Sequence, residues 1–338
     1  MTATHAALKL NEFIESGFYF NYFIMEEAAQ CTEIEAFIPL LINSQNRLDH
    51  VILIGDHNQL PPIVKNSTLS QHCNSDLSLF SHLTSVYNHD ITLDYQGRCR
   101  PSLAQLFDWK YPELKSFEFV SQDSFQLANT GLAFDYQFIN ISEYKGQSEH
   151  QPVPHYYQNV GEAEFICLFY MYLRLIGHSS QSISVLTSYS GQRDLLIDVF
   201  KHRLKKYSSF YEFPAHVSTI DSFQGRQNDI ILLSLVRTSS IGHLSDPRRL
   251  VVACSRARLG FYVFGKWELF SHSKPVLPVS SKFAKRPTNL CILPDEVFPS
   301  CRTVDDSGEY QVVDGVEHLA SVVGFLQKKV VKKINNYY

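Results

Sequence analysis

The sequence of 338 residues lacks an excess of positive charge. Lys and Arg together number 30 and Asp and Glu number 34, which gives a formal net charge of -4. This balance excludes a globally basic nucleic-acid binder of the histone kind. It does not exclude a local basic channel, because net charge says nothing about how the charges are distributed.

Membrane and metal signatures are also missing. The longest apolar run, Phe165 to Leu173, is too short for a membrane span of roughly 20 residues, and the start MTATHAALK shows no secretory signal. We therefore expect no membrane association and a location in the cytoplasm or nucleus. The seven Cys form no C-x-x-C pair, which indicates reduced thiols in an intracellular protein. The 14 His form no H-x-x-x-H or H-x-H set, which argues against a metal hydrolase.

Apolar strands alternate with helices along most of the chain. Such strands predict a parallel sheet covered on both faces, that is, an α/β fold. The length suits about two domains, with a break expected near residues 84–90 and a loss of periodicity after about Lys285. The expected strands are 22–25, 51–54, 183–187, 230–236 and 261–264, and the expected helices are 28–43, 101–110, 159–175 (from a capping box at Asn159 and Glu162) and 191–204.

Polar residues follow the first two strands. Glu26 and Glu27 end the first, and GDHNQLPP follows the second, so both segments fall where open α/β sheets bind ligands. A carboxylate pair can hold Mg²⁺ through water and polarise an attacking water, or it simply starts the next helix, where the dipole favours it. A polar amide in GDHNQLPP can sense a phosphate, or the segment is an ordinary turn ended by proline.

Three later segments carry arginines or cap-type residues. Arg98 and Arg100 in QGRCRP suit phosphate geometry, with a surface arginine pair as the alternative. The cap-type residues of TIDSFQGRQND leave N–H groups for a phosphate oxygen. Arg256 in ACSRARLG is either an arginine finger or a cation at a helix end.

In order and spacing, EEAAQ, GDHNQLPP, QGRCRP, TIDSFQGRQND and ACSRARLG resemble motifs II to VI of the superfamily 1 helicases. The wording of FIMEEAAQ, YQNVGEAE and RRLVVACSRARLG is similar to the intron-binding spliceosomal members, as far as about Phe298. The resemblance implies a RecA-like core with a partial first lobe over residues 1–90, a complete second lobe over 91–285, and a tail over 286–338.

The resemblance also implies ATP and Mg²⁺ as cofactors and assigns residue roles. Glu27 orients the attacking water, Glu26 holds Mg²⁺ through water in place of the usual Asp, and Gln59 senses the γ-phosphate. Arg98 and Arg256 match the arginines that the second lobe presents to the γ-phosphate. The other matches are Gln192, Gln224 and Gly225 at the nucleotide and Thr4 and Thr219 on the phosphates of single-stranded RNA, while Gln227 replaces a Glu common in motif V.

A helicase of this kind needs a P-loop, G-x-x-x-x-G-K-[ST], and the one near match is Gly260 to Trp267. Trp267 has no hydroxyl for Mg²⁺, and the four middle residues indicate a buried strand. We therefore expect the P-loop upstream of Met1 and a carboxyl-terminal fragment that is inactive alone.

The resemblance implies part of a nuclear, ATP-dependent RNA helicase of the spliceosome, with pre-mRNA introns and spliceosomal proteins as partners. Two alternatives remain: a non-catalytic ribonucleoprotein scaffold with a helicase fold, and a helicase of the Senataxin or nonsense-decay type outside the spliceosome. The terminal KKVVKK predicts a nuclear signal, an RNA contact or a solvated tail.

Overall fold

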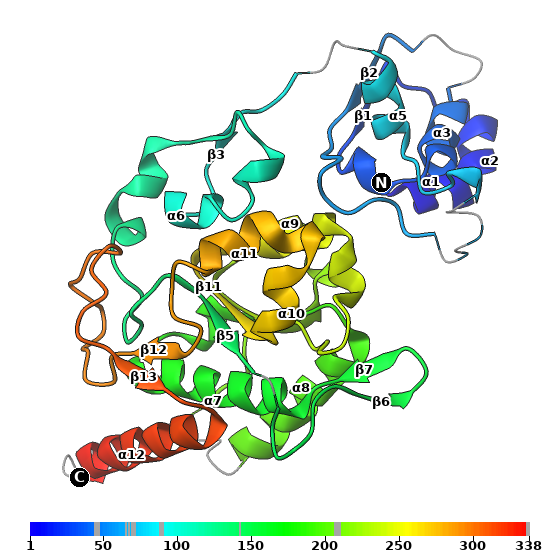
Figure 1. Cartoon of the computed structure of the whole chain (residues 1–338). Coiled ribbons are helices and arrows are strands. Elements are labelled where there is room, and N and C mark those ends of the chain that lie inside the picture. Colours follow the sequence, from blue (N-terminus) through cyan, green and yellow to red (C-terminus); the bar gives the residue numbers. More distant parts are fainter. Residues whose placement is uncertain are drawn as a thin grey trace. The chain divides into compact units, whose positions relative to one another are not determined.

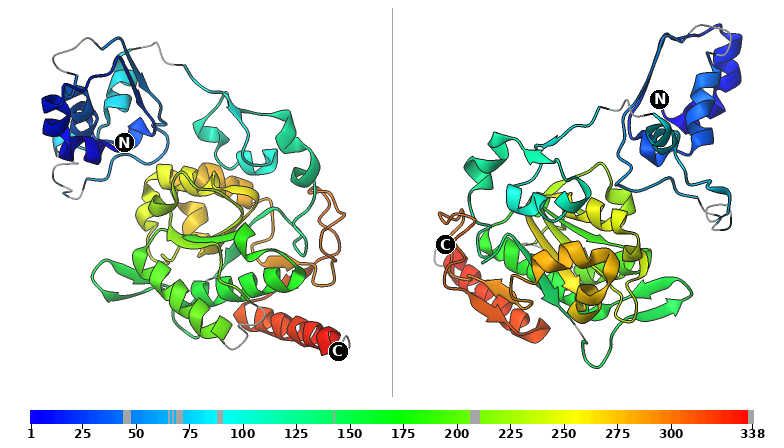
Figure 2. Two further views of the ribbon diagram at one scale, coloured as in Figure 1. Left: turned by 180° about the vertical axis from the view of Figure 1, so that it is seen from behind. Right: turned by 45° about the horizontal axis from the view of Figure 1, so that its top comes forward.

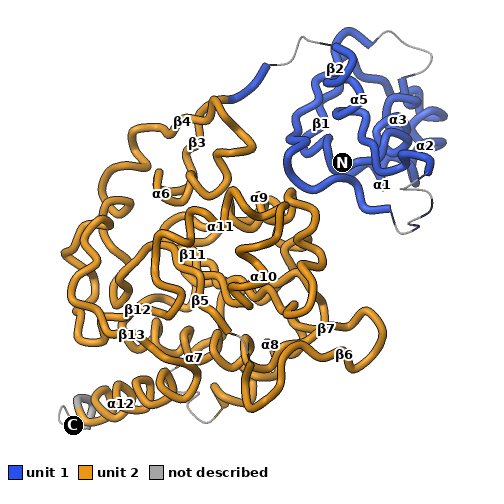
Figure 3. The backbone as a smooth tube through the Cα atoms, viewed as in Figure 1, with its two compact units in different colours: residues 1–93 blue, residues 94–338 orange. Residues whose placement is uncertain are grey.

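The computed structural model describes residues 1–43, 48–64, 66, 68, 72–87, 91–141, 143–205 and 211–335. The chain divides into two compact units, residues 1–93 and 94–338 (Figure 3). The break expected near residues 84–90 lies close to this division, and its residues 88–90 fall outside the described part.

Unit 1 contains two parallel strands and short helices. β1 (Tyr22–Met25) pairs with β2 (His50–Leu53), in agreement with the first two expected strands. The helices are α1 (Ala3–Leu8), α2 (Leu10–Glu15), α3 (Glu33–Leu41) and α5 (Leu79–Val86).

The helix expected over residues 28–43 is shorter than predicted. Glu27 adopts the left-handed conformation, with φ at 54°, and residues 28–30 form only a 3₁₀ turn. A capping box at Thr32 and Glu35 then starts α3, because each side chain accepts a hydrogen bond from the other residue's backbone N–H.

The sheet of unit 1 leaves apolar side chains in solvent. Tyr22 and Ile24 on β1 are 62% and 63% exposed, and Ile52 on β2 is 46% exposed. The small residues Ala6 and Ala36 are buried instead.

Unit 2 is built on a five-stranded parallel sheet in the order β5-β11-β10-β8-β9; β5 and β11 are labelled in Figure 1. The last three expected strands are confirmed with small shifts at their ends. The strands are β5 (Tyr136–Asn140), β8 (Ile183–Thr187), β9 (His216–Thr219), β10 (Asn228–Ser234) and β11 (Ala257–Gly265). Residues 261–264, the middle of the rejected P-loop match, therefore lie within a strand.

Helices cover both faces of this sheet, as Figures 1 and 2 show. α7 (Val160–Ile176) and α8 (Ser190–Lys205) pack on one face through the main apolar cluster. On the other face, Phe138 of β5 contacts Phe270 of α10 (Trp267–His272) and Phe283 of α11 (Leu277–Phe283). α9 (Pro247–Cys254) leads into β11. The doubly covered parallel sheet is the α/β fold that the sequence predicts.

Smaller elements complete unit 2. A helix was expected over 101–110, but α6 covers only Pro101–Ala104 and a separate 3₁₀ turn covers Asp108–Lys110. Phe107, with φ of -131°, lies between them outside the helical region. The short strands are β3 (Tyr95–Gln96) paired with β4 (Lys115–Ser116), and β6 (His150–Val153) paired with β7 (Tyr156–Gln158).

The segment expected to be a tail is folded. β12 (Leu290–Ile292) pairs with β13 (Gln311–Val313), and α12 (Val316–Asn335) lies beside α7 in both views (Figures 1 and 2). Leu319 and Val323 of α12 belong to the main core cluster. The weak periodicity of residues 286–315 hid this because strands as short as β12 and β13 give little pattern.

Candidate functional site

The loops that follow β1 and β2 lie against each other in unit 1. The backbone N–H of Ala28 donates to the carbonyl of Ile54 at 2.8 Å. A Cβ at Gly55 would stand 2.8 Å from the nitrogen of Ala29, so this close approach requires glycine. The two polar segments therefore share one edge of the sheet, as we expected from the sequence.

Two consecutive carboxylates stand at this edge. Glu26 and Glu27 are both exposed, and the Gln30 side-chain amide donates to Glu27 Oε2 at 2.5 Å. Glu27 has left-handed backbone, which is uncommon outside glycine and asparagine and is concentrated at functional sites. The αL turn ends β1 and separates the carboxylates from the helix that follows, which weakens the helix-start alternative.

Gln59 is held in the neighbouring loop. Its side-chain amide donates to Asp56 Oδ2 at 2.8 Å, and Asp56 Oδ1 accepts from the backbone N–H of Asn58 at 2.9 Å. These contacts fix an amide close to the chain that follows Gly55. Thr4 is exposed on α1, in the same unit.

The donor set at this edge suits Mg²⁺. Carboxylate oxygens are its usual protein ligands, and one or two of them, together with substrate phosphates and water, normally complete the shell. Glu26 and Glu27 supply two such groups in solvent. Among the residues that the structure describes, no three His, Cys, Asp or Glu side chains gather into a metal cluster.

Unit 2 brings Arg98 and Arg256 together at the amino-terminal ends of β10 and β11. Arg98 Nη1 donates to the carbonyl of Ser255 at 3.0 Å, and Arg256 Nη2 donates to the hydroxyl of the same serine at 2.8 Å. Arg98 Nε donates to Gln227 Oε1 at 2.8 Å. Two arginines that lie far apart in sequence therefore share one anchoring residue.

Arg256 also lies where a cation stabilises the carboxyl end of a helix. Only 2% of Arg256 is exposed, and its Nε donates to the carbonyl of Val252 in the last turn of α9 at 3.0 Å. A cation at a helix carboxyl terminus is stabilised by the dipole. The guanidinium thus stabilises the end of α9 and at the same time faces the Ser255 hydroxyl.

Gln224 and Gly225 lie in the chain before β10. The Nε2 atom of Gln224 is buried and has no hydrogen-bond partner among the described residues. Gly225 has a φ of 77° and open space where a Cβ would stand. A buried amide without a partner is costly, so this position suits an additional polar group.

Thr219 is placed at the carboxyl end of β9. Its hydroxyl donates to Ser222 Oγ at 2.8 Å and accepts from the backbone N–H of Ser222 at 3.3 Å. These contacts join the carboxyl end of β9 to the 3₁₀ turn Asp221–Phe223, whose N-cap residue is Ile220.

The sequence of this chain is similar to those of known proteins. Residues 75–268 match the profile of a family described as "AAA domain", and residues 2–67 match a second profile of the same description. Over its whole length the chain is 42% identical to "RNA helicase aquarius" of Mus musculus. The chain belongs to the superfamily 1 helicases.

Other relatives of this helicase chain include "Pre-mRNA-splicing factor cwf11" of Schizosaccharomyces pombe, at 26% identity over 97% of the chain. "Regulator of nonsense transcripts 1 homolog" of Arabidopsis thaliana is 30% identical over 76% of the chain and 20% of its own length. The chain spans 23% and 25% of the aquarius and cwf11 relatives. A solved arterivirus nonstructural protein 10 (helicase) complex with DNA aligns at a TM-score of 0.38 and 16% identity, over 76% of this chain and 43% of that one.

Gln192, which the sequence places at the nucleotide, is held within unit 2 of this helicase chain. It is fully buried, and its amide oxygen accepts from the backbone N–H of Asn159 at 2.7 Å. Its amide nitrogen donates to the carbonyl of Asn159 and to Ser234 Oγ. Gln192 therefore joins α8 to the start of α7 and to β10.

Two residues with clear roles escaped the sequence analysis. Ser255 joins both arginines, although only its position beside Arg256 pointed to it. Glu162 was assigned to a capping box, yet its carboxylate accepts from Ser234 Oγ at 2.6 Å and from the backbone N–H of Val236. Burial raises the pKa of Glu162 to about 8, against these hydrogen bonds, which lower it.

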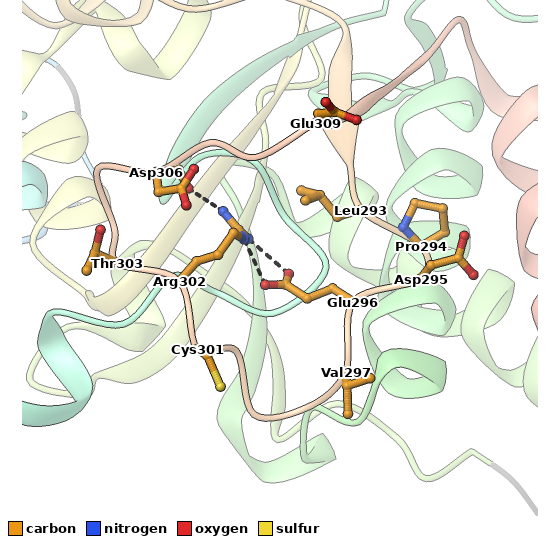
Figure 4. A pocket seen from close by; sticks show the side chains of 10 residues that line it. All are labelled: Leu293, Pro294, Asp295, Glu296, Val297, Cys301, Arg302, Thr303, Asp306 and Glu309. Carbon is orange, nitrogen blue, oxygen red and sulfur yellow. Dashed lines mark hydrogen bonds and ion pairs between the residues drawn. The ribbon is translucent and has the colours of Figure 1, made fainter.

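A surface pocket of about 710 Å³ lies in the segment between β12 and β13 (Figure 4). Arg302 and Glu296 form an ion pair in it, with Nε to Oε1 at 2.8 Å. Asp295, Asp306 and Glu309 also line it. The pocket contains none of the predicted site residues. Among the described residues, no helix is long and apolar enough to cross a membrane.

Proposed function

We propose that this chain is part of a nuclear, ATP-dependent RNA helicase that binds intron RNA during pre-mRNA splicing. The observation that carries the proposal is the 42% identity to "RNA helicase aquarius" along the full chain. The match to a pre-mRNA-splicing factor over 97% of the chain supports the same process. Spliceosomal proteins are its further partners.

The residues of unit 1 act on water and metal in this proposal. Glu27 accepts a hydrogen bond from the attacking water, orients it and takes its proton as general base. Glu26 holds Mg²⁺ through water, and Gln59 donates its amide to the γ-phosphate. Bound Mg²⁺ supplies charge neutralisation on the phosphate oxygens.

The residues of unit 2 act on the developing charge of the phosphoryl group. Arg98 and Arg256 donate N–H groups to the γ-phosphate, the role of arginine fingers. The orphaned amide of Gln224 and the open backbone at Gly225 provide polar contacts to the nucleotide. Thr4 and Thr219 bind phosphates of single-stranded RNA, which gives binding that tolerates sequence.

The test uses the natural full-length protein. We expect ATP hydrolysis that single-stranded RNA stimulates and that Arg98→Ala and Arg256→Ala each reduce strongly. In cells, crosslinking followed by sequencing of bound RNA should recover introns. Wild-type hydrolysis in both arginine variants would overturn the roles assigned to them, and a protein without any ATPase would favour the non-catalytic scaffold.

A helicase outside the spliceosome is the second candidate. It is favoured by the matches to regulators of nonsense transcripts, which cover 75% to 76% of the chain at 28% to 32% identity. Recovery of mature mRNA without introns in the crosslinking experiment would support this candidate and contradict the splicing role.

A further inference from the structure

Two neutral side chains hold the arginine pair of unit 2. The side-chain oxygen of Gln227 accepts from Arg98 Nε at 2.8 Å, and the carbonyl of Ser255 accepts from Arg98 Nη1 at 3.0 Å. The Ser255 hydroxyl accepts from Arg256 Nη2 at 2.8 Å. We propose that Gln227 and Ser255 are positioning residues that fix both guanidinium groups before any nucleotide binds.

The acceptors themselves are anchored to the fold. The Ser255 hydroxyl donates to the carbonyl of Val252 in α9 at 3.0 Å. The backbone N–H of Asn228, the residue after Gln227, donates to the carbonyl of Arg256 at 3.0 Å. Gln227 directly precedes β10, and Ser255 is the C-cap residue of α9, so each positioning residue adjoins a regular element of unit 2.

The chemistry of these acceptors preserves the charge of the pair. An amide oxygen, a carbonyl and a hydroxyl hold a guanidinium by hydrogen bonds without neutralising it. Arginine carries about 2 kcal/mol of rotamer entropy, and donors fixed in advance need no reorganisation when charge develops. Gln227 and Ser255 thus orient Arg98 and Arg256 through acceptors that are themselves uncharged.

This assignment gives Gln227 a role within unit 2. The side-chain oxygen of Gln227 is bonded to Arg98, so in this chain the residue serves unit 2 itself. The sequence alone left its role open. The inference rests on the proposed function, because orientation of the arginines matters only if they act on ATP.

The experiment measures kcat and KM for ATP in the natural full-length protein. Gln227→Met keeps the length of the side chain and removes the acceptor, and Ser255→Ala removes the hydroxyl while the backbone carbonyl remains. We expect each to lower kcat by roughly 3- to 10-fold, the size of one lost hydrogen bond, with KM changed less than about twofold. Gln151→Met on exposed β6 and Ser281→Ala on α11, whose hydroxyl also donates to a helix carbonyl, are matched controls with unchanged kcat.

Double variants identify the route of each effect. Gln227→Met should have no further effect in an Arg98→Ala background, and Ser255→Ala should have none in an Arg256→Ala background, when single-turnover rates are compared. Thermal unfolding midpoints identify any variant whose loss comes from unfolding, and Ser255→Thr, which keeps the hydroxyl, should restore kcat. Full additivity, or unchanged kcat in both single variants while Arg98→Ala and Arg256→Ala are slow, would overturn the inference and leave the proposed function intact. Wild-type rates in the two arginine variants would overturn the proposed function itself.

Discussion

At the scale of single residues, the exposed Glu27 carboxylate offers the most direct test. Glu27→Gln keeps the size of the side chain and removes the base, so ATP hydrolysis in the natural full-length protein should fall by roughly 10²- to 10⁴-fold. Nucleotide affinity should stay near that of the wild type. A steady-state ATPase assay measures the hydrolysis rate, and an equilibrium titration with a fluorescent ATP analogue measures the affinity. Turnover close to wild type would show that Glu27 is not a catalytic residue.

Arg256 is the second test at this scale, because its geometry fits two roles. As an arginine finger, Arg256→Ala should slow turnover by at least 10²-fold and weaken ATP binding much less. As a helix-end cation alone, it should lower the unfolding midpoint and leave turnover per folded molecule unchanged. Arg248→Ala, which removes an arginine at the opposite end of α9, controls for loss of charge on this helix. Equal, modest losses of affinity and turnover would contradict the finger role.

Which site residues the sequence predicted depends on how local their signals are. The adjacency of the loops at Glu27 and Gln59 followed from two parallel strands and was predictable. The contact of Arg98 with Ser255 joins segments 157 positions apart, and only the folded sheet brings them together. The predicted nucleotide contact of Gln192 stays a prediction, because a buried amide that satisfies backbone groups and one that binds a ligand have the same sequence signal.

At the scale of elements, the start of α7 departs from its predicted cap in an informative way. Asn159 caps the helix, as expected, by accepting from the backbone N–H of Glu162 at 3.1 Å. The Asn159 backbone N–H, however, donates to Gln192. The Glu162 carboxylate turns inward to β10 and to Val236, which has a φ of 74°. The helix end is thereby tied to two neighbouring elements.

This network predicts a dependence of stability on pH. The pKa of Glu162 is about 8 in the folded protein, above its usual value of 4.5, so the folded state holds a proton that unfolding releases. The contribution of the Glu162 proton to the unfolding free energy is therefore complete below about pH 4.5 and is lost as the pH rises toward about 8. Urea unfolding at pH 5.5 and pH 8 measures this. Between these two pH values, the unfolding free energy of Glu162→Gln should fall by less than that of the wild type, with a difference of up to a few kcal/mol. The exposed Glu268→Gln variant controls for removal of one carboxylate, and an identical pH slope in Glu162→Gln and wild type would contradict this account.

At the scale of the whole molecule, the alternating pattern was enough for the fold class but not for the strand order. Continuous apolar runs at Ile183–Thr187 and in β10 predict buried parallel strands. The order β5-β11-β10-β8-β9 arises from tertiary pairing, which no single run specifies. The carboxyl-terminal segment shows the same limit, because α12 is amphipathic and short strands precede it, yet only its contact with α7 makes it part of the core.

The contact between α12 and α7 predicts which part of the chain folds alone. Leu319, Val323 and Leu326 of α12 are buried in the main core cluster, and burial of each such side chain contributes about 1.5–3 kcal/mol. Residues 94–338 should therefore unfold cooperatively. Residues 94–285, which lack α12 and expose the apolar surface it covers on α7, should be far less stable or aggregate. Circular dichroism melts and size-exclusion chromatography of the two proteins compare them directly.

Leu319→Ala in residues 94–338 should lower the unfolding free energy by about 2–5 kcal/mol, whereas Val331→Ala at a 40% exposed position of the same helix should change it by less than about 1 kcal/mol. Equal stability of residues 94–338 and 94–285 would show that α12 contributes nothing to the core of unit 2.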